Sequence, residues 1–157
     1  MAYAGSTIAA TASQFSTLQL FNNSQYAELL LVRDWVLGSS GTNTWVLNVG
    51  QTNLGLTTVP VNPVNPLDIV PPGLVTSGAT ATQITTGYQL RGFAAPGLNW
   101  YHDFPFAILP ANWYFTMQVQ NVNILETISV YWEAITPDQL NEDAWLARNL
   151  ELAQGNG

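Results

Sequence analysis

The sequence predicts an all-β protein, an antiparallel β-sandwich that ends in a short C-terminal α-helix. Residues 113–120 alternate strictly between apolar and polar side chains, which is the period of a strand with one buried face and one wet face. Threonine, asparagine and serine far outnumber the charged residues, and they favour strands and turns over helix interiors. A hydroxyl cap at Thr136, a proline at Pro137 and a capping-box residue at Gln139 predict where the helix begins.

The chain of 157 residues is about one domain long. Residues 1–13 are small and polar with nothing to bury, so we expect an N-terminal arm that is ordered only where it docks. The β-sandwich domain is expected over residues 14–135, and the helix and tail over residues 136–157.

The first half of the domain contains three expected strands, which are residues 15–21, 26–38 and 44–52. The second of these is apolar on both faces, which is typical of a central strand buried on both sides. In the third, Trp45, Leu47 and Val49 share one face.

Residues 59–78 hold five of the nine prolines, and proline cannot donate to a strand ladder. They therefore predict a long extended loop outside the sheets. Such a loop usually carries an interaction or inserts into a neighbour, and the alternative is a solvated flap without a partner. Strand character resumes over residues 81–93, where Ile84, Tyr88 and Leu90 share a parity.

The clearest periodicity lies in residues 113–135, which predict two strands around a reversal at Asn121–Asn123. We expect these strands to form a hairpin with one apolar side, which a second sheet must cover, and we expect residues 26–38 to pair with it. The apolar side is made of Trp113, Phe115, Met117 and Val119 in the first strand and of Ile124, Ile128, Val130, Trp132 and Ala134 in the second.

The expected C-terminal helix has one apolar stripe, formed by Leu140, Ala144, Ala147, Leu150 and Ala153. Trp145 and Leu152 fall off this stripe. This pattern indicates either burial on two sides or a second surface that meets another subunit.

Charge and composition exclude several classes of function. Charged residues make up only 8% of the chain, the net charge is -7, and the three arginines are scattered. Binding to nucleic acid or to an anionic membrane surface is therefore not expected. The chain has no cysteine, and neither a signal peptide nor an apolar run of membrane-spanning length is recognisable, so we expect synthesis in the cytoplasm of the cell that makes it.

No catalytic, cofactor or metal site is expected. His102 is the only histidine, Asp103 should point away from it on a strand, and no nucleophile motif accompanies them. Glu126 and Glu133 have opposite parity, so they should face different ways, and we interpret them as ordinary strand carboxylates. The acidic residues lack the spacing of known metal loops.

Aromatic residues raise one binding hypothesis. Trp100, Tyr101 and Tyr114, with Asn99 and Asn112 nearby, are the residue types of a sugar-stacking platform. The favoured alternative is that these rings fill the core between sheets or a subunit contact.

Three features together resemble a known class of protein. They are LQLFNNSQYAELLLVRDWVLG over residues 18–38, AILPANWYFTMQVQNVNILETISVYWEAI over residues 107–135, and the short helical tail. The pattern is similar to small virion proteins of tailed bacteriophages in head decoration, fibre or tail positions. The resemblance covers about half the chain and leaves Gly50 to Gly97 unmatched. It implies a β-sandwich or jelly roll that assembles as a symmetric oligomer and binds its neighbours without an active site.

Two functional hypotheses follow. The first is a non-enzymatic structural protein of a phage particle, a homo-oligomer with trimeric symmetry expected, which binds other virion proteins. The second is a carbohydrate- or receptor-binding module with a host surface glycan as ligand. Candidate contacts for either partner are Trp100, Tyr101, Tyr114, Trp145 and Leu152. A weakly charged surface keeps copies apart poorly and favours the first hypothesis.

Overall fold

The computed structural model describes residues 1–26, 28–94, 96–97, 99–102, 107–136 and 138, and only the backbone of residues 88, 89, 93, 94 and 99–102. The strands in this part of the chain are β1 (Ala2–Ile8), β2 (Phe15–Phe21), β3 (Leu29–Ser39), β4 (Asn43–Gly50), β5 (Thr57–Val59), β6 (Asn62–Pro63), β7 (Leu74–Thr80), β8 (Tyr88–Ala94), β9 (Asn99–His102), β10 (Ala107–Leu109), β11 (Tyr114–Val122) and β12 (Glu126–Ile135). The expected C-terminal helix falls on residues 137 and 139–157, which lie outside the described residues.

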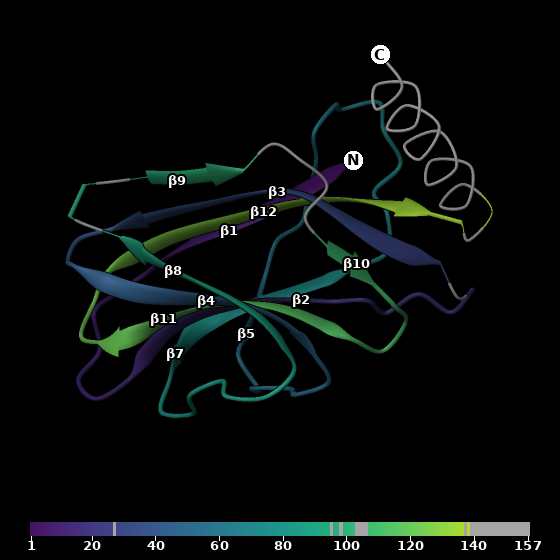
Figure 1. Cartoon of the computed structure of the whole chain (residues 1–157). Helices are drawn as coiled ribbons and strands as arrows, with labels where there is room; N and C mark the ends of the chain where they lie inside the picture. The colour runs from purple at the N-terminus through teal and green to yellow at the C-terminus, as the bar shows by residue number, and fades with distance from the viewer. Residues whose placement is uncertain (27, 95, 98, 103–106, 137, 139–157) are drawn as a thin grey trace, which may run out of the picture.

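The strands form two antiparallel sheets that pack face to face (Figure 1), so the predicted β-sandwich is confirmed. Sheet A has the order β10-β3-β12-β1-β6, and β9 also pairs with β3. Sheet B has the order β5-β7-β2-β11-β4-β8.

The strand pairs are nested as in a jelly roll. The first strand pairs with the last, β1 with β12, and the second with the last but one, β2 with β11. Further in, β3 pairs with β9 and β10, and β4 pairs with β8. The jelly-roll arrangement is completed where β12 pairs with β3 and β11 pairs with β4.

The expected hairpin of the last two strands is wrong. The chain does reverse at Asn123, whose φ is 62°, but β11 belongs to sheet B and β12 to sheet A. Side-chain alternation identifies the buried face of a strand and carries no information about its hydrogen-bonded partner. The two apolar faces are the predicted ones, and they lie opposite each other across the core. The expected pairing of residues 26–38 is correct for β12.

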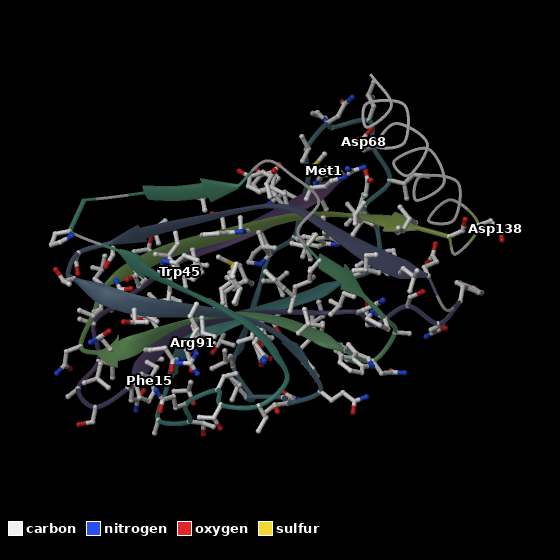
Figure 2. All side chains as sticks on the ribbon, in the orientation of Figure 1. Met1, Phe15, Trp45, Asp68, Arg91 and Asp138 are labelled. Carbon is white, nitrogen blue, oxygen red and sulfur yellow. The ribbon has the colours of Figure 1, made fainter. Side chains whose placement is uncertain are left out.

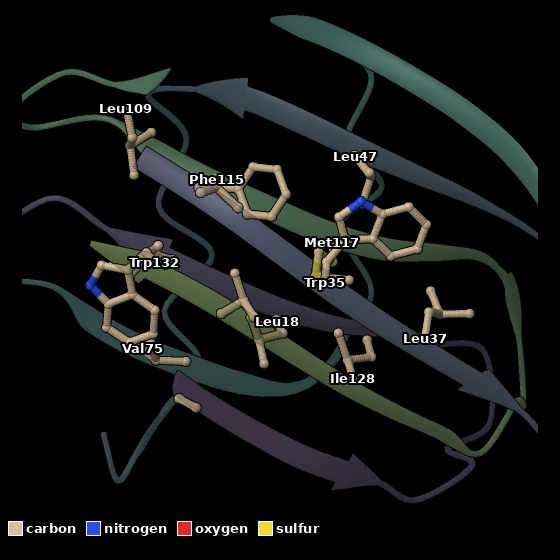
Figure 3. Packing of buried hydrophobic residues seen from close by; sticks show 14 of the residues in the cluster. Leu18, Trp35, Leu37, Leu47, Val75, Leu109, Phe115, Met117, Ile128 and Trp132 are labelled. Carbon is tan, nitrogen blue, oxygen red and sulfur yellow. The ribbon is translucent and has the colours of Figure 1, made fainter. Parts of the chain in front are cut away.

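Tryptophans from both sheets meet inside the sandwich. Trp35 of β3 and Trp45 of β4 pack with ring centroids 5.0 Å apart and planes tilted by 60°. Trp132 is fully buried in the same core as Val75 and Met117, and Figure 3 shows these side chains in the space between the two sheets. The predicted inward face of Trp45, Leu47 and Val49 is confirmed, because all three belong to this core or pack against it.

Residues 1–13 do not form a separate arm along their whole length. Residues 2–8 are strand β1, paired with β12 along its full length. The expectation that they have nothing to bury is wrong, since Ala2 and Ala4 are fully buried in the core. Small residues suit this position because β1 and β2 approach each other across the sandwich.

The proline-rich segment is only partly a loop. Its last residues form β7, which pairs with β2 along seven residues in sheet B. Pro63 lies in β6 at the edge of sheet A, where a residue without an N–H is tolerated. The strand expected over residues 81–93 begins only at Tyr88, and Gly87 before it has a φ of 92°.

The outer face of sheet B is covered, so the wet face predicted for β11 is wrong. Gln118 is fully buried there, and its Nε2 donates to the Thr82 carbonyl at 2.9 Å. Its Oε1 accepts the backbone N–H of Ile84 at 2.7 Å. Gln19 of β2 bonds the 52–54 segment in the same way. Two glutamines thus hold two connecting segments flat against the sheet, and this arrangement leaves no periodic signal in the sequence.

The substitution Gln118→Ala tests this cover. It is expected to lower the free energy of unfolding by about 1–3 kcal/mol, because the buried N–H of Ile84 and the carbonyl of Thr82 lose their partner. Urea unfolding followed by tryptophan fluorescence measures the change. Gln51→Ala at an exposed position is the matched control, with a change below about 0.5 kcal/mol. Equal losses from the two variants would contradict a covered face.

Candidate functional site

The three aromatic residues of the hypothetical sugar platform lie on two different sheets. Trp100 and Tyr101 lie on β9, at the edge of sheet A, where their backbones pair with Leu37 and Val36. Tyr114 lies on β11 in sheet B. The ring of Tyr114 is half-buried and stacks on Phe21, with centroids 4.5 Å apart. Because β11 alternates, with Phe115 in the core, Tyr114 faces away from sheet A and from the other two residues.

The remaining predicted site residues have separate places. Asn99 is on β9 opposite Gly38, and Asn112 occupies a turn with a φ of 66°. The backbone of His102 pairs with Trp35 on β3. Asp103, Trp145 and Leu152 lie outside the described residues. Of the residues proposed as partner contacts, the structure therefore describes the side chain of Tyr114 alone.

One surface feature is an exposed apolar loop within the proline-rich segment. The sequence predicted a loop there but not which of its side chains are exposed. We call residues 64–73 the apolar loop. Leu67 and Ile69 are each 92% exposed, and Val64 and Val70 are also exposed. Aliphatic side chains gathered on one loop are unusual on a monomer and mark interaction surfaces. The proline content drew attention to this segment, but its exposure could not be read from the sequence.

The base of the apolar loop is fixed to the core. The indole Nε1 of the fully buried Trp132 donates to the Pro72 carbonyl at 2.9 Å. The next residue, Gly73, has a φ of 141°, and a Cβ there would lie 2.8 Å from the same indole nitrogen. The N–H of Gly73 donates to Asn23 Oδ1 at 2.7 Å. Glycine is therefore required at this position by both backbone conformation and space.

The tip of the apolar loop is also ordered by hydrogen bonds. The N–H of Leu67 donates to Asn65 Oδ1 at 3.2 Å, and the N–H of Asp68 donates to the Asn65 carbonyl at 2.9 Å. The Met1 ammonium lies 3.7 Å from the Asp68 carboxylate, and Figure 2 shows the two residues side by side. Leu67 and Ile69 are thus presented on a preformed turn, which lowers the entropic cost of binding.

A buried acid lies at the start of β12. Glu126 is fully buried between Ser39 at the end of β3 and Asn43 at the start of β4, and Asn43 Nδ2 donates to its Oε1 at 2.8 Å. Desolvation by burial raises the pKa of Glu126 from 4.5 to about 7, although hydrogen bonds from Ser39 and Asn43 oppose the shift. Glu126 is therefore not the ordinary strand carboxylate that the sequence analysis expected.

The unpaired atoms of this cluster agree with a protonated Glu126. Among the described residues, the buried Oε2 of Glu126 and the buried Oδ1 of Asn43 have no hydrogen-bond partner. Both are acceptors when the acid is ionised. A proton on Oε2 turns that atom from an unpaired acceptor into a donor, which lowers the number of buried acceptors without a partner.

Glu133 faces the other way, as its parity predicts. It is half-buried on the outer face of sheet A, where Arg33 Nε donates to its Oε1 at 2.9 Å. A register shift in the β3–β12 ladder lets Val32 and Trp35, three residues apart, both enter the core. The strict alternation that would point Arg33 and Asp34 to opposite faces of the sheet is interrupted at this bulge. The two glutamates do not form a carboxylate pair.

Comparisons of the chain with protein-family models, with curated proteins and with solved structures found no match. Within the described ranges, no three histidine, cysteine, aspartate or glutamate side chains are grouped to hold a metal ion. In the same part of the chain, no helix is long and apolar enough to cross a membrane. The functional argument therefore depends on the surfaces and the buried acid described above.

The raised pKa of Glu126 makes stability depend on pH. As the pH rises above 4.5, the unfolded chain loses this proton before the folded chain does, so the folded state loses stability up to a pH of about 7 and then levels off. The total loss is about 3.5 kcal/mol, at about 1.4 kcal/mol per unit of pKa between 4.5 and about 7. Glu126→Gln keeps a neutral amide in place, and its advantage over wild type should grow by most of that amount between pH 4.5 and 7.

Denaturant unfolding at several pH values measures this difference. Glu133→Gln on the same strand is the matched control and should retain the wild-type slope, since it leaves Glu126 in place. A Glu126→Gln variant with the wild-type slope would mean that folding does not raise the pKa of Glu126.

Proposed function

We propose that this chain is a non-enzymatic structural component of a virus particle, in which a β-sandwich assembles as a symmetric homo-oligomer and binds neighbouring virion proteins. The positions suggested for it are head decoration, fibre or tail, and the suggested oligomer is a trimer. The observation that carries the proposal is the apolar loop, with Leu67 and Ile69 held in solvent on a rigid base.

Energetics favour a partner for this loop. Burying a leucine or isoleucine side chain is worth about 1.5–3 kcal/mol, and both residues forgo nearly all of this gain in the single chain. The base of the loop is anchored to Trp132 and its tip is held by the contacts of Asn65 and Asp68, so Leu67 and Ile69 are presented in their exposed positions. A second copy of the chain is the occupant we propose, because covering such residues is what a subunit interface does.

The charge distribution supports contact between identical copies. Charged residues make up 8% of the chain, and the two carboxylates of β12 are taken up by burial or by the ion pair with Arg33. Few charged side chains therefore have to lose water when identical copies meet, and the net charge of -7 on each copy is a repulsion that added salt screens.

The strand order gives an argument by analogy. Jelly rolls form many viral capsid domains, and the nested pairing of β1 with β12 and β2 with β11 is of that type. Fold alone does not imply function, since lectin domains share the same strand order. The fold is therefore compatible with a virion protein, and the specific argument for one comes from the apolar loop.

The double substitution Leu67→Asn and Ile69→Asn tests the proposal. Both side chains are almost fully exposed, so folding should be unaffected, while the concentration at which the oligomer dissociates should rise by about tenfold or more. Sedimentation velocity over a range of protein concentrations measures the mass and its dependence on concentration.

Leu90→Asn is the matched control, because Leu90 is an exposed leucine on edge strand β8 of the other sheet. Its dissociation should follow the wild type. A wild-type chain that stays monomeric at every concentration would refute the assembly proposal, and equal effects of the loop and control substitutions would remove the loop from the interface.

A further inference from the structure

A groove on the outer face of sheet A is separate from the apolar loop and goes beyond the proposed assembly function. It has a volume of about 410 Å³ and lies over strands β1 and β12, with the segment from Val59 to Asn62 along its side. This volume falls in the range of small-molecule sites, about 300–1,000 Å³.

Three cross-strand pairs of residues form the floor of the groove. Tyr3 lies opposite Tyr131, Gly5 opposite Ser129, and Thr7 opposite Thr127. Strand alternation points all six away from the core, as the buried positions Ala2, Ala4, Ile128, Val130 and Trp132 between and beside them demonstrate. The groove therefore has an aromatic end, an open middle and a hydroxyl end.

The aromatic end is a preformed stack. The rings of Tyr3 and Tyr131 are 5.6 Å apart with planes 24° from parallel, and Tyr3 is 37% exposed. Each ring limits the freedom of the other, so a ligand that stacks here finds the surface already arranged.

The open middle depends on Gly5. A Cβ at this position would lie 2.3 Å from Ser129 Oγ and 3.2 Å from the Ile128 carbonyl. Any larger residue would push Ser129 out of its place and raise the floor between the tyrosines and the threonines. Glycine in a strand interior often marks a site where a ligand approaches the backbone closely.

The hydroxyl end and the side wall supply polar groups without charge. Thr7 Oγ1 lies 3.2 Å from Thr127 Oγ1, and the Asn62 amide beside Tyr3 adds both donors and an acceptor. None of the residues that line the groove is charged. From this combination of stacked aromatic surface and neutral hydroxyl and amide groups, we infer that the groove binds a neutral carbohydrate chain.

Other ligand classes fit the groove less well. A nucleic acid would require cations, and none lines the groove in a chain of net charge -7. A peptide added as a strand binds through the backbone at a sheet edge, where β6 already pairs beside Tyr3, whereas the groove is formed by side chains on the face of the sheet. Sugar rings match the site because one face stacks on tyrosine while the hydroxyls at the rim meet Thr7, Thr127 and Asn62.

Saturation-transfer NMR with neutral tetrasaccharides tests the inference. The probes are cellotetraose, maltotetraose, mannotetraose and chitotetraose, each titrated into the full-length wild-type protein. At least one should receive saturation from the protein and bind with a dissociation constant on the order of 1 mM, as a single stacking surface allows. Tyr3→Ala should weaken that binding by about tenfold, and Tyr3→Phe should preserve it within about threefold.

Two further variants separate the groove from the rest of the fold. Tyr114→Ala removes a stacked tyrosine on the other sheet, one of the residues of the hypothetical platform, and should leave sugar binding unchanged. Thr127→Val removes one rim hydroxyl with little change of shape on a strand that favours valine, and should weaken binding. The absence of transfer to all four sugars, or equal binding by wild type, Tyr3→Ala and Thr127→Val, would overturn the inference. Either result would leave the oligomerisation proposal untouched.

Discussion

The structure depends on the packing of two apolar sheet faces around bulky indole rings. Trp35 and Trp45 meet across the core, and Trp132 fills the end near the apolar loop. Rings of this size set the positions of what surrounds them. A Cβ at Gly92 on β8 would lie 2.0 Å from the Trp45 ring, and a Cβ at Gly73 would lie 2.8 Å from Trp132. Both glycines are therefore consequences of the tryptophans, because a rigid indole cannot yield the space.

The nested strand order explains how a short chain builds two distinct ends. Because β1 to β4 alternate between sheets, every connection between them crosses from one layer to the other. One such crossing, between β3 and β4, brings Ser39 and Asn43 against Glu126 and buries the acid. The segment leading into β7 passes Trp132, which anchors the apolar loop. The same topology that closes the core thus creates the polar cluster and the exposed loop.

The sequence predicted the buried faces of the strands well and the hydrogen-bonded neighbours of the strands poorly. The inward sets containing Trp45 and Trp132 could be read from alternation, since burial of one face imposes a period of two. The partner of β11 could not, because alternation is the same whether the next strand pairs beside it or lies across the core. The buried Gln118 was misjudged because its cover comes from irregular segments. Tyr3 was missed because small, alternating residues 2–8 resembled an arm, although Ala2 and Ala4 on one parity were a strand signal. Because β1 was not predicted, the stacking surface of Tyr3 and Tyr131 could not be predicted either.

The two outer faces of the sandwich have opposite consequences for binding. On the outer face of sheet B, Gln19 and Gln118 form hydrogen bonds with two connecting segments of the same chain, which cover that face. In the groove over β1 and β12 of sheet A, the residues directed outward are hydroxyls, a glycine and two stacked tyrosines, and no strand or loop covers them in the described part of the chain. The apolar loop is anchored through Trp132 of β12, which also carries Tyr131. The proposed subunit contact and the proposed sugar groove are therefore both supported by β12.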